Sequence, residues 1–160
     1  MVNDEIKYFT VIRLRGKRGV RKKVEDTLKM LRLNRVNHAS LVPGTSSFLG
    51  MLQFVKDYVT WGEVNEETTA LLLKKRGFIV GNKKLSDQLV KEKLGYNSIG
   101  DLAKELHSSK IILSRLPLLK PVFRLSPPSK GFKGSKHMPY PEGSLGYRGE
   151  AINDLLKRMI

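Results

Sequence analysis

The chain has 160 residues, 40% of them hydrophobic, which is enough for one folded domain with its own core and excludes a wholly disordered chain. Thirty Lys and Arg stand against fifteen Asp and Glu, so the net charge of +15 predicts a polyanionic partner, with nucleic acid as the first candidate. The lack of cysteine excludes a disulfide scaffold, a Cys-based zinc site and a thiol nucleophile, and the lack of a long apolar run or a signal peptide leads us to expect a cytoplasmic protein.

Residues 6–15 predict a first strand, because they are rich in β-branched and aromatic residues. Four residues at period two form its predicted inward face: Ile6, Tyr8, Ile12 and Leu14. Gly16 and Gly19 then break the strand, and residues 20–33 predict a helix. The apolar stripe of this helix follows helical spacing through Val20, Val24, Leu28 and Leu31.

The next segments repeat the same alternation. Residues 36–42 predict a second strand, and a second helix is expected to begin near Thr45 or Ser46, either of which can cap it. Four residues of that helix are expected to point inward: Phe48, Leu49, Leu52 and Val55. Residues 58–64 predict a third strand, which gives the order β-α-β-α-β.

The following part of the chain favours helices. Asn65 is expected to cap a helix that ends at Gly77. Two shorter helices are expected over residues 85–94 and 99–107, with Gly95 as the stop between them. This part therefore differs in character from the alternating segments before it.

The last part changes again. Residues 111–125 are apolar and β-like, whereas residues 126–149 contain four prolines and five glycines and predict an extended loop. A closing helix is expected over residues 150–159. We therefore expect two parts, a β-α-β-α-β core over residues 1–64 and a helical, loop-rich extension over residues 65–160.

A run without acidic residues lies where the first strand gives way to the first helix. Residues 13–23, which we call the basic turn, hold seven cations. Six of them are candidate contacts to nucleic acid: Arg13, Arg15, Lys17, Arg18, Arg21 and Lys22. A helix start suits phosphate, because its backbone N–H groups are free and carry a positive partial charge. The alternative is a solvated basic surface turn.

A second basic region lies in residues 106–141, which hold seven Lys and Arg and no Asp or Glu. Its aromatic residues, Tyr140 among them, could stack on exposed bases. The candidate contacts in this region are Lys130, Phe132, Lys133, Lys136 and His137. The alternative is a disordered basic linker.

Three segments share the pattern Gly-x-basic-Gly, at residues 16–19, 131–134 and 146–149. Flanking glycines let the backbone approach a phosphate closely. The third segment adds Arg148 as a candidate contact. The KH module places a GxxG loop between two helices. None of these segments is predicted to sit so, and we interpret them as backbone contacts or as chance matches.

The sequence shows no pattern typical of catalysis or metal binding. The three histidines, at positions 38, 107 and 137, lack metal-ligand spacing, and there is no Walker loop or GxSxG motif. His38 lies in a predicted strand and is expected to be a hydrogen-bonded structural residue. Trp61 is expected to be packed, with Gly62 giving it room. We expect no enzyme activity, no metal and no cofactor.

Four blocks together resemble a known family. The run YFTVIRLRG at residues 8–16 resembles the large-subunit ribosomal protein family numbered thirty in bacteria and archaea, whose eukaryotic member is numbered seven. Residues 50–63, 123–134 and 145–159 are similar to characteristic blocks of its archaeal members. Eukaryotic members carry a long basic N-terminal arm, whereas this chain starts almost at its first strand, so we expect the archaeal type.

The resemblance implies an α+β fold with a ferredoxin-like β-α-β-α-β core, an antiparallel sheet and helices on one face, followed by the extension. It also implies a structural constituent of the large ribosomal subunit, a monomer that contacts ribosomal RNA and neighbouring ribosomal proteins but no membrane or small-molecule substrate. Two alternatives stay open. One is an RNA-binding protein or RNA chaperone outside the ribosome, and the other is a small phosphate-ester enzyme on the same core.

Overall fold

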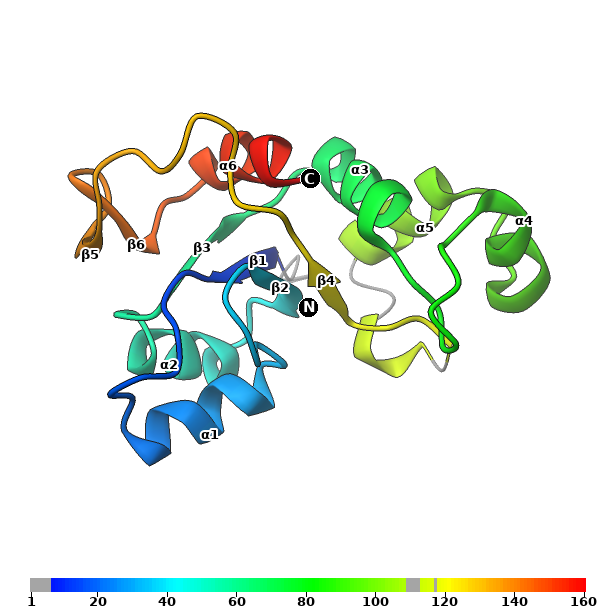
Figure 1. Ribbon diagram of the computed structural model, residues 1–160. Helices are drawn as coiled ribbons and strands as arrows, with labels where there is room; N and C mark the ends of the chain where they lie inside the picture. Colours follow the sequence, from blue (N-terminus) through cyan, green and yellow to red (C-terminus); the bar gives the residue numbers. More distant parts are fainter. Residues whose placement is uncertain (1–6, 109–112, 117) are drawn as a thin grey trace, which may run out of the picture.

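The computed structural model describes residues 7–108, 113–116 and 118–160, so our predictions for Ile6 and for residues 109–112 lie outside the described residues. The first elements are β1 (Tyr8–Arg13), α1 (Lys22–Met30), β2 (His38–Pro43), α2 (Ser46–Phe54) and β3 (Val59–Glu63). The predicted β-α-β-α-β order is therefore confirmed (Figure 1).

The extension adds a further set of helices, turns and strands. Its elements are α3 (Glu66–Arg76), α4 (Asp87–Leu89), a π-helical turn (Val90–Leu94), α5 (Ile99–His107), a 3-10 turn (Leu113–Arg115), β4 (Val122–Arg124), β5 (Ser135–Pro139), β6 (Gly143–Tyr147) and α6 (Ala151–Met159). The predicted signals at the helix ends are confirmed for α3, where the Asn65 side chain accepts a hydrogen bond from the Thr68 amide at 2.8 Å. They are also confirmed at Gly95, which has a φ of 77° and stops the π-helical turn.

The described strands form one six-stranded sheet in the order β4-β2-β1-β3-β6-β5. The central strand β1 pairs antiparallel with both β2 and β3, as expected for the core, and Phe9 lies opposite Val42 on one side and Glu63 on the other. The extension adds β4 antiparallel to β2, and β6 parallel to β3. Strands of both predicted parts thus share a single sheet.

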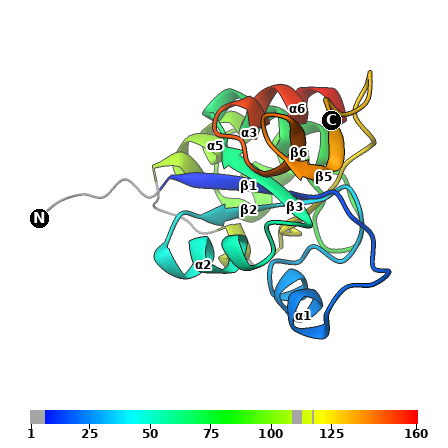
Figure 2. The ribbon, with the colours of Figure 1, turned by 90° about the vertical axis from the view of Figure 1, so that its left-hand side faces the viewer.

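Helices cover both faces of this sheet (Figure 2). One face packs on α1 and α2, and its core contains Phe9 and Val11 of β1. The other face packs on α3, α5 and α6, and its core contains Tyr8 and Ile12. The two helices of the β-α-β-α-β core therefore lie on one face, as predicted, and the extension covers the other. All six residues of β1 are buried because each face has its own layer of helices.

Two expectations about individual segments are wrong. Residues 126–149 are not one extended loop, because they contain β5 and β6. Proline and glycine are unusual inside strands and hid both elements. At Gly143 a side chain is excluded, since a Cβ atom would lie 2.0 Å from the Met138 carbonyl oxygen. In α2, Leu49 points outward and is 39% exposed, whereas Leu52 and Val55 are buried as expected.

Trp61 is buried as expected, but Gly62 makes room for a different segment of the chain and not for Trp61. Trp61 belongs to the core on the α1–α2 face. The side chain of the next residue points to the opposite face. There, a Cβ atom on Gly62 would lie 2.0 Å from the carbonyl oxygen of Gly149 and 3.0 Å from the Cβ atom of Ile152. Gly62 thus permits the start of α6 to approach β3.

Candidate nucleic-acid interface

The basic turn joins β1 to α1 and presents most of its cations to solvent. Lys17 and Arg18 are exposed, as are Arg21, Lys22 and Lys23 at the start of α1. Among the residues that the structure describes, no side chain caps the N-terminus of this nine-residue helix. The turn therefore combines free helix N–H groups with a row of cations, which is the arrangement that the sequence predicted.

Arg15 attaches the basic turn to the start of β3. Its Nη1 donates a hydrogen bond to the Asp57 carbonyl oxygen at 3.2 Å, and its guanidinium carbon lies 5.0 Å from the centroid of the Tyr58 ring. The backbone amide of Leu14 donates to the Tyr58 carbonyl oxygen at 2.9 Å. These contacts fix the direction in which the turn leaves the sheet.

Arg13 differs from the other cations of the basic turn, because it is only 1% exposed. Its Nε donates to the Arg15 carbonyl oxygen at 2.8 Å, and its Nη1 donates to the Leu33 carbonyl oxygen at 2.7 Å. Burial lowers the pKa of its guanidinium, against the opposing effect of Glu25. Arg13 therefore braces the turn from inside and offers no surface to a partner.

His38 and His107 are both half-buried. Burial lowers the pKa of His38, and the nearby charges of Arg124, Arg35 and Arg13 act in the same direction. Its buried Nδ1 atom has no hydrogen-bond partner within the described residues, contrary to our expectation of a hydrogen-bonded residue. His107 lies 2.9 Å from the Thr69 hydroxyl, and burial lowers its pKa as well.

These two histidines predict a pH-dependent stability. Since the folded pKa of each is depressed, unfolding takes up protons as the pH falls below the ordinary histidine pKa of about 6.5. The free energy of unfolding should therefore be full above about pH 6.5 and should fall below it. Urea unfolding at about pH 7.5 and about pH 5.5 measures this loss. Between the two pH values, His38→Gln and His107→Gln should lose less free energy of unfolding than the parent, whereas exposed His137→Gln should lose as much as the parent.

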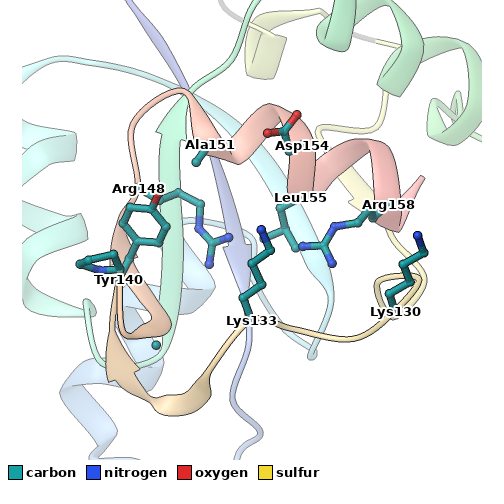
Figure 3. Close-up of a pocket in the computed structure, with 10 residues that line it drawn as sticks. Lys130, Lys133, Tyr140, Arg148, Ala151, Asp154, Leu155 and Arg158 are labelled. Atoms are coloured by element: carbon teal, nitrogen blue, oxygen red, sulfur yellow. The ribbon is translucent and has the colours of Figure 1, made fainter.

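The second basic region forms one wall of a cavity of about 580 Å³ between the β5–β6 segment and α6 (Figure 3). We call this cavity the C-terminal pocket. Its lining includes four cations, one carboxylate and one aromatic ring: Lys130, Lys133, Arg148, Arg158, Asp154 and Tyr140. The structure thus brings Lys130, Lys133 and Arg148 of the predicted site together, although Arg148 is distant from the other two in sequence.

Arg148 is held in place by the sheet. Its Nε donates to the Thr60 hydroxyl at 2.8 Å, and its Nη2 donates to the Ser144 carbonyl oxygen at 2.7 Å. Its guanidinium carbon lies 5.4 Å from the centroid of the Tyr140 ring. Burial lowers the pKa of Arg148, and the charge of Arg158 adds to this effect while Tyr140 opposes it. A positive charge that is partly removed from water gains most from an anion nearby.

Arg158 is a member of the pocket that sequence reasoning missed. It lies on α6, and its Nη1 donates to the Gly131 carbonyl oxygen at 2.7 Å and to the Ser129 carbonyl oxygen at 3.3 Å. These bonds tie the loop that carries Lys130 and Lys133 to the closing helix. The sequence does contain one signal for this position of Arg158. It follows Leu155 by three residues, which places both side chains on one face of a helix.

The remaining predicted residues lie beside the pocket. Lys136 and His137 are exposed on β5. Phe132 is half-buried and packs against the core, and the Lys136 ammonium lies 4.8 Å from its ring centroid. Phe132 thus supports Lys136 instead of presenting a free ring.

The basic turn and the C-terminal pocket share one anchor, the start of β3. Arg15 and Leu14 bind the carbonyl oxygens of Asp57 and Tyr58, and Arg148 binds the Thr60 hydroxyl. Tyr58 and Thr60 are two residues apart, which corresponds to about 7 Å along a strand. Both figures place the basic turn and the β5–β6 segment at the same end of the molecule, on the left of Figure 1 and the right of Figure 2. The first Gly-x-basic-Gly segment lies in the turn and the other two border the pocket.

Other kinds of site find no support in the described part of the chain. Within residues 7–108, 113–116 and 118–160, no three His, Asp or Glu side chains gather where they could hold a metal ion. Over the same ranges no helix has the length and hydropathy that crossing a bilayer requires.

Known proteins resemble the chain over almost its full length. A model of the family described as Ribosomal protein L30p/L7e matches residues 9–59. The large ribosomal subunit protein uL30 of Archaeoglobus fulgidus is 54% identical over 151 residues, which cover 94% of this chain and 99% of that relative. The protein of the same name from Nanoarchaeum equitans is 53% identical over 154 residues, which cover 95% and 98% of the two chains.

The extent of these matches decides the family. The large ribosomal subunit protein uL30 of Methanosphaera stadtmanae is 47% identical over 152 residues, covering 95% of this chain and 99% of that relative. All three relatives are archaeal, and they match the extension as well as the core, so the expected archaeal type is confirmed. The chain belongs to the uL30 family of large-ribosomal-subunit proteins.

Proposed function

We propose that this protein is a structural constituent of the large ribosomal subunit that binds folded ribosomal RNA and stabilises it by neutralising phosphate. The observation that carries the proposal is the pair of basic surfaces on one end of the molecule, both attached to the start of β3. Two sites held at a fixed separation suit a folded RNA, because it presents phosphates at fixed positions. RNA shape then supplies specificity, since side chains cannot read the deep groove of A-form RNA.

The proposed RNA contacts are the candidate residues whose side chains reach the surface or line the pocket. In the basic turn they are the half-buried Arg15 and the exposed Lys17, Arg18, Arg21 and Lys22. In and beside the pocket they are Lys130, Lys133, Lys136, His137 and Arg148, with Phe132 in support. Arg13 acts through the fold of the turn. We further propose a cytoplasmic, ribosome-bound monomer without catalytic activity.

Neighbouring ribosomal proteins are proposed to contact a different surface. Helix α2 contains no charged residue and exposes Leu49 and Phe54, the latter by 54%. An uncharged, apolar helix face suits contact with protein better than contact with phosphate.

Sedimentation of a cell extract tests the ribosomal role. The protein should travel with the large subunit through high salt, and ultraviolet crosslinks to ribosomal RNA should map to residues 13–23 and 130–137. Migration as a light particle with other RNA would support the RNA chaperone instead. Crosslinks confined to other parts of the chain would overturn the assignment of the two surfaces.

Single substitutions test the surfaces one at a time. Arg18→Gln and Lys133→Gln should each weaken binding to large-subunit ribosomal RNA and reduce the slope of log affinity against log salt concentration by about one, since each removes one phosphate contact. Filter binding over a salt series measures both quantities. Lys83→Gln, an exposed lysine on the α3–α4 loop, is the control and should leave the slope unchanged.

A further inference from the structure

The C-terminal pocket has a shape that phosphate binding alone does not require. Its volume of about 580 Å³ lies within the range of about 300–1,000 Å³ that is usual for pockets that enclose a small ligand. Pro141, Ala151 and Leu155 give it apolar walls next to the cations. A surface that only follows an RNA backbone needs charges and little depth. Apolar walls inside a basic cavity instead suit a ligand with a flat, uncharged part and an anionic part.

The cations of the pocket would bind the anionic part of such a ligand. Figure 3 shows the charged ends of Lys133, Arg148 and Arg158 converging on the space beneath α6. Hydrogen bonds to backbone and hydroxyl oxygens hold both arginines in position, so little side-chain freedom is lost on binding. Asp154 also lines the cavity, but one carboxylate stands against four cations, which leaves the pocket positive.

Tyr140 supplies a surface for the flat part of the ligand. Its ring lines the pocket and stays 42% exposed, with the Arg148 guanidinium 5.4 Å from the ring centroid. Its backbone amide donates to the Leu145 carbonyl oxygen at 2.9 Å, which ties the residue to β6. Unstacked RNA bases bind to aromatic rings and to guanidinium planes, and here the Arg148 guanidinium lies over one face of the Tyr140 ring.

We propose that the C-terminal pocket receives one unpaired nucleotide of the RNA, its base against Tyr140 and Arg148 and its phosphate between Lys133 and Arg158. The proposal rests on RNA binding as the function and names what this one site recognises. A paired base in an A-form helix is stacked between its neighbours and cannot enter a cavity. The ligand is therefore a bulged or looped-out nucleotide.

The test compares two RNA hairpins that differ by one bulged nucleotide, each of the four bases being tried in turn. The full chain should bind the best bulged hairpin about tenfold tighter than the perfect one, because stacking of one base contributes roughly that factor. Tyr140→Leu should abolish this preference, so that the bulged and the perfect hairpins bind with equal affinity. Tyr140→Phe, which keeps the ring, should retain it. Thermal unfolding checks that each variant is folded.

The outcomes separate the pocket from the general function. Failure to bind either hairpin or large-subunit ribosomal RNA would refute RNA binding itself. Equal binding of both hairpins, or a preference that survives Tyr140→Leu, would overturn the pocket proposal and leave RNA binding intact. Lys133→Gln provides a second variant, and it should weaken binding of the bulged hairpin more than that of the perfect one. Perturbation of the Tyr140 resonances by polyglutamate but not by the bulged hairpin would assign the pocket to an acidic protein segment.

Discussion

Replacing Lys17, Arg18, Arg21 and Lys22 together by glutamine is expected to weaken binding to large-subunit ribosomal RNA by a factor on the order of 100. All four side chains are exposed on the basic turn. An exposed ion pair is worth up to about 1 kcal/mol, so four lost contacts amount to about 2–4 kcal/mol. The slope of log affinity against log salt should fall by about 3–4, as expected when about four phosphate contacts are lost.

A variant of equal charge distinguishes the turn from the net charge. Replacing Lys83, Lys91, Lys93 and Lys104 by glutamine removes the same four charges from exposed positions on the α3–α5 side of the molecule. This control should lose far less affinity and keep its salt slope. Equal losses in the two variants would mean that overall charge governs binding and that the basic turn has no special place in it.

Replacing Gly62 by alanine is expected to destabilise the fold by about 3 kcal/mol or more, at the upper end of overpacking substitutions. The new methyl group would meet the carbonyl oxygen of Gly149 at 2.0 Å, and a backbone atom cannot rotate away as a side chain can. Relief requires α6 to move away from β3, which opens the core around Ile152. The midpoint of thermal unfolding should fall by about 6–12 °C for a chain of this size.

Gly50 offers the matched control for this substitution. It lies in the middle of α2, and among the described residues no heavy atom beyond its chain neighbours and the backbone of its own helix is within 4 Å of the position that its Cβ would take. Gly50→Ala should stabilise the protein by about 0.5–1 kcal/mol, because alanine is the better helix former. If Gly62→Ala unfolded at the same temperature as the parent, the close approach of α6 to β3 would not exist in solution.

The fold of the first 64 residues could be predicted because each segment carries its own periodic signal. The stripe Val20, Val24, Leu28 marked α1, and the period-two pattern of Tyr8 and Ile12 marked β1. The strands β5 and β6 carried no such signal. Gly143 is required by its close approach to the carbonyl group of Met138, five residues earlier, and β6 is completed by its pairing with β3, which is distant in sequence. Tertiary contacts of this kind override local propensity.

The candidate site divides in the same way. Charge density along the chain identified the basic turn and the residues around Lys133, because cations adjacent in sequence stay adjacent in a turn. Sequence could not show that Arg13 turns inward, since only the returning segment at Leu33 supplies its acceptor. Nor could it place Thr60 and Arg158 beside Arg148, because these residues meet only when the sheet and α6 come together.

The two faces of the sheet also differ in when they can be completed. Every buried residue of the α1–α2 core lies between Phe9 and Trp61. The opposite core needs Ile152, Leu155 and Met159, which belong to the last nine residues of the chain. Since a nascent chain emerges from its N-terminus, the first core can close while synthesis continues. The other face of β1 stays open until α6 has been synthesised and has packed against it, so this helix completes the second core.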